Sequence, residues 1–272
     1  MEAKFELRPL SEDLGAEVTG YDFDRVPGED TVRWLRQALL DHHLLLFRGR
    51  NLDPARQIAF TLLFGSQVHT CPPRNRFVPG FPEIVRACNR EGEGLINIGP
   101  YWHSDGAHLQ EPTAVSVHHI VVATEDGDTL YTSLASAYER LPPEGRRHVS
   151  RMRTRSQTGI APPLVLPHPV TGRLGLYMNL DHNAAIVDEF DHENRAMRDA
   201  LERHLGAEGT YYRHQWRGGD MLVVDNFAAA HRATRADPAA LHVLHRTSID
   251  GPSAWWRNGA RASFRVGALM AS

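Results

Sequence analysis

Hydrophobic residues recur at helical spacing in two segments of the first part of the chain. In EDTVRWLRQALLDHH (29–43), aliphatic residues return every three or four positions, which predicts an amphipathic helix. The apolar run HLLLFRG follows it and predicts a short buried strand. A second helix is expected within LDPARQIAFTLLFG (52–65). There Asp53 suits the N-cap, Pro54 the first helical position and Gly65 the end of the helix.

The remainder of the chain is dominated by short β-branched or aromatic segments bounded by turn residues, which predict strands. These segments are EIVRAC, TAVSVHHIVVA, DTLYTSL, LGLYMNL, TYYRHQW, DMLVVDN and LHVLHRTSI. One helical segment, HENRAMRDALERHLG (192–206), interrupts them. We find no repeat, linker or low-complexity tract, so we expect a single domain over residues 1–272. Many short strands in one domain predict a mainly β fold, a barrel or jelly roll with flanking helices.

Composition narrows the classes of function. The chain has 272 residues, of which 42% are hydrophobic and 23% charged, and its net charge of −3 argues against a nucleic-acid partner. No apolar run is long enough to span a membrane, and MEAKFELRPL lacks the apolar core of a secretory signal. Two cysteines, Cys71 and Cys88, are too few for a disulfide scaffold. We therefore expect a cytoplasmic protein that acts on a small molecule, without a membrane partner.

Two segments far apart in the sequence suggest a metal site. The stretch GPYWHSDGAH (99–108) places His103 two residues before Asp105, but the chain has 16 histidines, so this pair alone is weak. His231 follows an apolar strand and a turn. Two histidines and one carboxylate form the facial triad that holds Fe(II) and leaves coordination positions open. Structural zinc would need four ligands, and no CxxC pattern is present. A zinc hydrolase using the same ligands and a non-catalytic binding protein remain alternatives.

Beyond these ligand candidates, the chain resembles the TauD/TfdA family of Fe(II)- and 2-oxoglutarate-dependent dioxygenases nearly from end to end. The blocks that carry the resemblance are LGAEVTGYDFDRV, LLLFRGRNLDPARQIAFTLLFG, YWHSDGAHLQEPTAVSVHHIVVATEDGDTLYTSLASAYERLP and YRHQWRGGDMLVVDNFAAAHRA…HRTSIDG. Several blocks in the same order are far more specific than one His-x-Asp pair. The resemblance implies a double-stranded β-helix, or jelly roll, in agreement with the strand-rich pattern.

The resemblance also assigns roles to single residues. It implies that His103, Asp105 and His231 are the iron ligands, and that Thr129 hydrogen-bonds the distal carboxylate of 2-oxoglutarate. On propensity alone, Thr129 is equally well explained as an ordinary strand residue. Because the carboxylate ligand is present, the resemblance disfavours chlorination and makes hydroxylation the default. Desaturation and other oxidative outcomes remain alternatives.

The pattern of arginines departs from the family. Relatives carry one arginine that pairs with 2-oxoglutarate and, four residues later, a second that often binds the substrate anion. Here His242 takes the first position and Arg246 the second, 15 residues after His231. We favour Arg246 as the anchor of 2-oxoglutarate because a dianion needs a permanent positive charge, with Arg235 and His242 as alternatives. Phe227 stands where relatives commonly have arginine.

Three further residues are candidates for contact with the substrate. By resemblance, His69 lies close to the place of a substrate-binding histidine, whereas Asn97 and Tyr101 simply precede the metal-binding loop. His118 and His119 lie on a predicted strand and point to opposite faces, so at most one faces the site. The resemblance implies O2 as co-substrate, succinate and CO2 as by-products, and a small anionic or amino-acid-like substrate. Relatives are often dimers or tetramers, so a homo-oligomer of either size is compatible with the resemblance.

Overall fold

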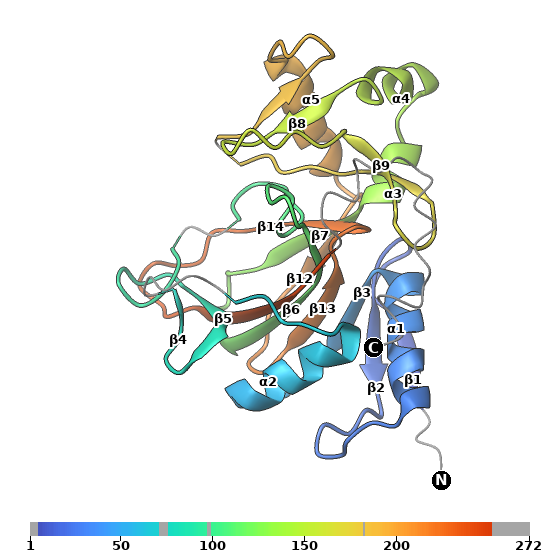
Figure 1. The fold of residues 1–272 in the computed structure, drawn as a ribbon. Helices are drawn as coiled ribbons and strands as arrows, with labels where there is room; N and C mark the ends of the chain where they lie inside the picture. The colour runs from blue at the N-terminus through green and yellow to red at the C-terminus, as the bar shows by residue number, and fades with distance from the viewer. Residues whose placement is uncertain (1–4, 71–75, 97–98, 182, 252–272) are drawn as a thin grey trace.

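The computed structural model describes residues 5–70, 76–96, 99–181 and 183–251, and Figure 1 shows their arrangement. Its main element is an eight-stranded sheet in which all neighbours are antiparallel except β2 and β3. The strands, in spatial order, are β1 (Glu6–Pro9), β2 (Ala16–Thr19), β3 (Leu44–Phe47), β13 (Met221–Asp225), β6 (Thr113–Val122), β15 (Val243–Asp250), β5 (Phe81–Cys88) and β4 (Phe77–Val78).

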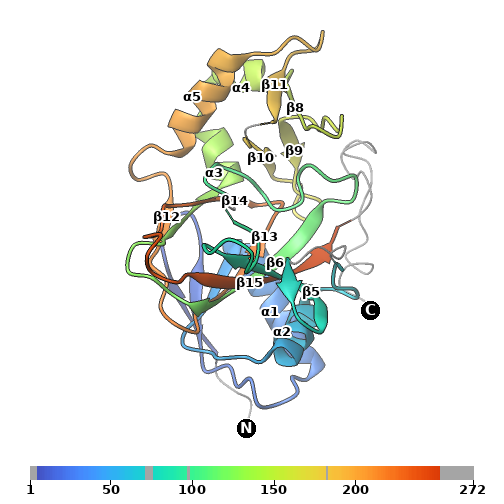
Figure 2. The ribbon, with the colours of Figure 1, turned by 90° about the vertical axis from the view of Figure 1, so that its left-hand side faces the viewer.

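A second, antiparallel sheet faces the first. It contains β12 (Tyr212–His214), β7 (Thr129–Ser133) and β14 (Ala229–Ala233). The chain passes from β6 to β7 and again from β13 to β14, and each time it crosses from the large sheet to the small one. Figure 2 shows β14 above β13, β6 and β15. Two facing antiparallel sheets confirm the predicted jelly roll.

The two faces of the large sheet pack against different partners. On β13, Leu222 and Val224 belong to a cluster with Tyr131 of the small sheet. Met221 and Val223 instead belong to the cluster that contains the buried leucines of the first helix. We call the side toward the small sheet the inner face and the side toward the first two helices the outer face. Alternation along each strand decides which residues reach each face.

Helices α1 (Glu29–His42) and α2 (Pro54–Thr61) cover the outer face, α1 against β3 and β13 and α2 against β5 and β15. Asp53 caps α2 as expected, because its side chain accepts a hydrogen bond of 2.9 Å from the Arg56 N–H. A short 3₁₀ turn, η1 (Leu62–Phe64), then leads to Gly65. Any side chain at Gly65 would collide with Ile249, so the chain requires glycine here.

The remaining elements lie together at the top of Figure 1, beyond the small sheet. Of these, the sequence predicted only the strand at LGLYMNL and the helix within 192–206, which begins where Asn194 caps it. The full set of elements in this upper part is α3 (Leu134–Glu139), α4 (Pro143–Val149), α5 (Arg195–Leu205), and the strand pairs β8 (Arg153–Arg155) with β11 (Ala185–Val187) and β9 (Val165–Pro167) with β10 (Leu174–Leu176).

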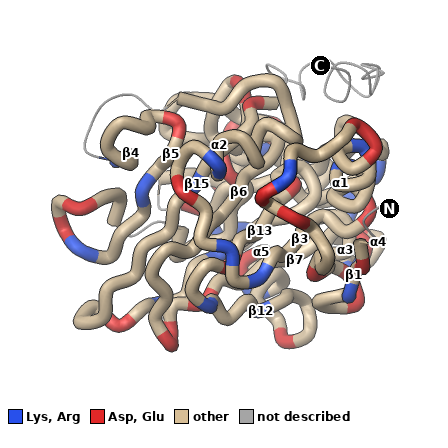
Figure 3. The backbone as a smooth tube through the Cα atoms, turned by 90° about the horizontal axis from the view of Figure 1, so that it is seen from below, with Lys and Arg blue, Asp and Glu red and all other residues tan. Residues whose placement is uncertain are grey.

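The surface of the described residues carries both signs of charge. Figure 3 shows acidic and basic residues intermixed around the molecule when it is seen from below, which agrees with the small net charge of −3. Within the described segments, no helix is both long and apolar enough to cross a bilayer. Cys88 is buried and is not in a disulfide, and Cys71 lies outside the described residues.

Candidate active site

The backbone brings the two predicted histidine ligands together. His231 lies on β14, although the sequence had placed it after a strand rather than within one. Its N–H donates a hydrogen bond of 2.8 Å to the His103 carbonyl, and the His103 N–H donates one of 3.0 Å in return. Such directly opposed antiparallel residues project their side chains from the same face, and the two rings lie 4.2 Å apart.

Asp105 completes a three-ligand cluster. Its Oδ1 lies 3.9 Å from Nε2 of His103 and 4.0 Å from Nε2 of His231, and ligand atoms of the three residues all lie within 4.8 Å of one another. All three side chains are buried. The cluster is compact enough for one cation to contact all three residues after small side-chain rotations.

The protonation states of these residues suit metal binding. Nδ1 of His103 lies 2.9 Å from the Tyr101 carbonyl, which can only accept, so Nδ1 carries the proton and the Nε2 lone pair is available. Burial lowers the pKa of His103, and burial together with His103 holds the pKa of His231 well below its ordinary value. Burial opposes ionisation of Asp105, but Arg246 and His118 outweigh it and hold the pKa of this carboxyl well below its ordinary range. Neutral histidines and an ionised carboxylate are the forms that bind metal.

Glycine is required beside the cluster. Gly99 has a positive φ of 69°, and a Cβ there would lie 2.5 Å from Cε1 of His103. A larger residue would therefore strain the backbone and displace the ring of His103.

The histidines of this cluster open onto a cavity of about 550 Å³. The same cavity is lined by all four residues expected to bind 2-oxoglutarate: Thr129, Arg235, His242 and Arg246. Apolar side chains that include Val85, Leu95 and Leu244 complete much of the wall. The structure thus gathers residues from β5, β7, β14 and β15 around one space.

The strand registers place the expected cofactor residues at different levels of this cavity. Arg246 lies opposite His118 on β6, and its guanidinium makes an ion pair with Asp105. Thr129 lies opposite Ala233, two positions along from the pair His231–Tyr131. Arg246 is therefore at the level of the ligand cluster, and Thr129 is displaced from it along the strand.

Thr129 and His242 each make side-chain hydrogen bonds within the protein beside the cavity. Oγ1 of Thr129 accepts a hydrogen bond of 3.0 Å from the Trp216 indole N–H, and its hydroxyl also interacts with that of Tyr131. Nδ1 of His242 lies 3.2 Å from Oγ1 of Thr124, and burial lowers the pKa of His242. Arg235 is exposed where it lines the cavity.

Of the expected substrate residues, the two that the structure describes, His69 and Tyr101, do not line the described part of the cavity. His69 pairs instead with Asp250, with 3.0 Å between Nδ1 and Oδ1. Tyr101 is half-buried beside His103, with ring centroids 5.1 Å apart. Asn97 lies outside the described residues. Phe227, at the position where relatives commonly carry arginine, packs with His168, 6.1 Å between ring centroids, and does not line the cavity.

Sequence reasoning missed the groups that hold Asp105 in place. Ser116 and His118 donate to its Oδ2 at 2.7 and 3.0 Å. The Asp105 N–H donates to Oδ1 of Asn226 at 3.1 Å, and Nδ2 of Asn226 donates to Oγ of Ser116 at 3.0 Å. Alternation along the predicted strand put Ser116 and His118 on one face, but it gave no sign of which face adjoins the site.

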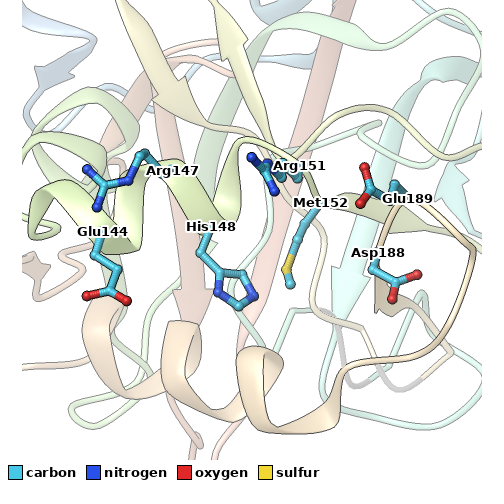
Figure 4. A pocket seen from close by; sticks show the side chains of 7 residues that line it. All are labelled: Glu144, Arg147, His148, Arg151, Met152, Asp188 and Glu189. Carbon is cyan, nitrogen blue, oxygen red and sulfur yellow. The ribbon is translucent and has the colours of Figure 1, made fainter.

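A second hollow, of about 370 Å³, lies between α4 and the segment that contains Asp188 and Glu189. Figure 4 shows Glu144, Arg147 and His148 on one side of it and the two acidic residues on the other. It holds none of the predicted site residues, so the chemistry is expected in the larger cavity.

Comparison with known proteins decides the family. The model of the taurine catabolism dioxygenase TauD, TfdA family matches residues 6–248. The chain belongs to this family. It is a 2-oxoglutarate-dependent non-haem iron dioxygenase, which uses Fe(II) as cofactor and 2-oxoglutarate and O2 as co-substrates. The donor set fits Fe(II), because it offers two neutral imidazoles and one carboxylate without a thiolate.

The relatives carry varied names. The chain is 28% identical to pentalenolactone F synthase of Streptomyces arenae, over 91% of this chain and 95% of that protein. It is 26% identical to the alpha-ketoglutarate-dependent 2,4-dichlorophenoxyacetate dioxygenase of Cupriavidus pinatubonensis, over 89% and 96% respectively. Among solved structures, a taurine dioxygenase from Burkholderia xenovorans superimposes with a TM-score of 0.76 at 28% identity, covering 91% of this chain and 90% of that one.

Proposed function

We propose that this enzyme hydroxylates an unactivated C–H bond of a small anionic molecule at an iron held by His103, Asp105 and His231. The observation that carries the proposal is the gathering of these ligand atoms within 4.8 Å beside a cavity of about 550 Å³ that Thr129 and Arg246 also line. Bound Fe(II), 2-oxoglutarate and O2 supply the oxidising chemistry, with succinate and CO2 as by-products. The protein orients the reactants and excludes water from them.

The two ends of 2-oxoglutarate are proposed to bind different residues. Arg246 lies at the level of the iron ligands, which favours contact with the carboxylate nearer the metal. Thr129, displaced along β7, donates from its hydroxyl to the distal carboxylate, with His242 as a second neutral donor. This division retains Arg246 as the charged anchor and explains how a histidine serves where relatives have arginine.

The substrate is proposed to combine an apolar part with an anionic group. The apolar wall beside the cluster, which includes Val85, Leu95 and Leu244, suits the carbon that is oxidised. Arg235 lines the same cavity while remaining exposed, where it can meet an anion. Names of the relatives, which include a dichlorophenoxyacetate, a phenoxypropionate and a taurine dioxygenase, support small anions as the class.

An anaerobic titration tests the ligand and cofactor assignments together. Fe(II) and then 2-oxoglutarate are added to wild type, His231→Ala, Arg246→Ala and Thr129→Val, and the visible charge-transfer band of the chelate is recorded. We expect a band in wild type and none in His231→Ala. A wild-type protein that binds Fe(II) but gives no band with 2-oxoglutarate would contradict the proposal.

A shorter co-substrate distinguishes the residues that bind the two ends of 2-oxoglutarate. 2-Oxobutyrate has the metal-binding end of 2-oxoglutarate but no distal carboxylate. Thr129→Val should therefore weaken binding of 2-oxoglutarate and leave that of 2-oxobutyrate unchanged, whereas Arg246→Ala should weaken both. If Arg246→Ala affects only 2-oxoglutarate, Arg246 binds the distal carboxylate instead.

Product analysis tests the reaction type. Candidate aryloxy, sulfonic and amino acids are screened for succinate formation, and the product of each active substrate is examined by mass spectrometry. Gain of one oxygen atom is expected. Loss of two hydrogens as the main outcome would show that the enzyme desaturates its substrate.

A further inference from the structure

The two oxygens of the Asp105 carboxylate have different surroundings. Oδ1 faces Nε2 of His103 and Nε2 of His231, at 3.9 and 4.0 Å, and accepts a hydrogen bond from the Arg246 guanidinium at the edge of the cavity. Oδ2 points the other way and accepts hydrogen bonds from Ser116 and His118, at 2.7 and 3.0 Å. The fold therefore presents Oδ1 to the two histidine ligands and to Arg246, and it engages Oδ2 with Ser116 and His118, away from the cluster.

The hydrogen bonds of His118 define which of its nitrogens carries a proton. Nε2 faces a carboxylate oxygen, which can only accept, so Nε2 donates. Nδ1 lies 3.1 Å from the hydroxyl of Tyr131 and accepts its proton. Burial, with Asp105 nearby, raises the pKa of Tyr131 well above its ordinary value, which keeps this hydroxyl protonated. A directed chain thus runs from Tyr131 through His118 to Asp105.

The same chain reaches the second histidine of the cluster. Tyr131 lies directly opposite His231 on the paired strands β7 and β14, and the two rings stack with centroids 5.6 Å apart and planes at 28°. The ring of His118 lies 5.0 Å from that of His231. His118 and Tyr131 are buried, which limits their freedom to move. His118 therefore bonds one proposed ligand, Asp105, and its ring lies beside that of a second, His231.

We propose that His118 is a positioning residue that holds Oδ2 of Asp105, so that Asp105 binds the metal through Oδ1 alone. The inference rests on the proposed function, in which Asp105 is an iron ligand. Two histidines and one carboxylate oxygen leave three of six octahedral positions for 2-oxoglutarate and O2. A carboxylate that is free to turn can bind through both oxygens and occupy one of those positions. Mutation of a residue that hydrogen-bonds a metal ligand typically lowers metal affinity or activity by about 10–100-fold.

Two substitutions divide the functions of the imidazole ring. The amide nitrogen of glutamine reaches nearly as far as Nε2 of histidine, so His118→Gln retains a donor for Asp105 and loses the acceptor for Tyr131. Asparagine reaches only as far as Nδ1, so His118→Asn loses the bond to Asp105. The neighbouring buried histidine gives a matched control, His119→Asn, because His119 contacts Gln57 on the outer face and not Asp105.

The affinity for Mn(II) alone, measured from the EPR signal of free Mn(II), provides a readout independent of turnover. We expect His118→Asn to bind Mn(II) about 10-fold more weakly than wild type, whereas His118→Gln and His119→Asn stay within about 2-fold. The affinity for 2-oxoglutarate at saturating Mn(II) should fall in His118→Asn as well. If His118→Asn does not fold, His118→Leu, which is also unable to donate, is measured in its place with the same expectation.

The outcomes separate this inference from the proposed function. If Asp105→Ala binds Mn(II) like wild type, the ligand assignment itself is wrong. If Asp105→Ala loses Mn(II) while His118→Asn retains wild-type affinity for both Mn(II) and 2-oxoglutarate, only the role of His118 is refuted. Equal losses in His118→Asn and His118→Gln would also refute it, because the bond to Asp105 would then not be the cause.

Discussion

His118 and His119 are neighbours on β6, yet they enter opposite faces of the large sheet and meet different chemistry. On the inner face, His118 bonds Asp105 and lies across from Arg246 of β15. On the outer face, His119 bonds Gln57 of α2 at 3.2 Å and lies across from His245. Two adjacent histidines on one strand therefore contact Asp105 of the ligand cluster on one face and a helix on the other.

The two faces also handle burial of polar groups differently. On the inner face, Asp105 is ionised because Arg246, Ser116 and His118 compensate for its burial. On the outer face, burial lowers the pKa of His119, and it lowers that of His245 to about 4. The inner face thus retains the charge of Asp105, whereas burial on the outer face keeps His119 and His245 neutral.

The largest expected effect comes from removing an inner-face ligand. His231→Ala deletes only the side chain, so the backbone pairing of His231 with His103 should survive and the protein should fold. We expect turnover to fall by more than the roughly 100-fold that loss of a ligand's partner can cause. Succinate formation measures it, and circular dichroism checks the fold. A variant with one tenth of wild-type activity would rule out His231 as a ligand.

Arg246 and Arg235 provide the next test. Arg246 pairs with buried Asp105, whereas Arg235 is exposed and lines the same cavity. We expect Arg246→Ala to raise the KM for 2-oxoglutarate on the order of 100-fold, because it removes a partly buried charge from an anion site. Arg235→Ala should change it only a few fold. The reverse ranking would move the charged anchor to Arg235.

A smaller effect, on stability, is expected on the outer face. The lowered pKa of His245 means that the folded protein binds fewer protons there than the unfolded chain. Stability is therefore fully present above the unfolded pKa of about 6.5 and falls as pH decreases from there toward about 4. His119 and Arg86 both oppose protonation of His245.

His245→Gln should remove part of the loss of stability that the protein shows as pH falls. After allowance for partial solvent exposure, we expect the difference in unfolding free energy between pH 7 and pH 5 to shrink by about 1 kcal/mol. Urea denaturation at the two pH values measures it. An unchanged difference would show that His245 does not contribute to acid sensitivity.

The smallest effect is expected at His69, outside both packed faces. His69 is partly exposed and pairs with Asp250, so His69→Ala should cost no more than about 1 kcal/mol of stability. The KM for 2-oxoglutarate should stay within about 2-fold of wild type, because His69 does not line the described cavity. A large rise in the KM for the substrate alone would restore the role that the sequence suggested for His69.

Local sequence signals were sufficient for both outer-face helices. Asp53 and Pro54 mark the start of α2, and regular aliphatic spacing marks α1. Strand β14, in contrast, has the sequence AAHRA, without β-branched residues, and forms because β7 pairs with it. The three-residue strands β8 and β11 likewise depend on each other across a long stretch of sequence, whereas β9 pairs with its neighbour β10.

The ligand set of the site was predictable from the resemblance to the family, whereas contacts that depend on strand register were not. His103, Asp105 and His231 share a recognisable chemistry, and the structure brings them together. The contacts of Ser116 and His118 with Asp105 depend on which face of β6 is inward, and periodicity alone leaves that choice open. The level of Arg246 in the cavity similarly follows from its pairing with His118.

The most direct test of the central claim is the amount of Fe(II) bound per chain under anaerobic conditions. We would compare wild type, Asp105→Ala on the inner face and His119→Asn on the outer face by equilibrium dialysis. The account predicts one iron for each chain of wild type and of His119→Asn, and loss of that iron in Asp105→Ala. Tight binding of one iron by Asp105→Ala would contradict the account, because the metal would then lie elsewhere.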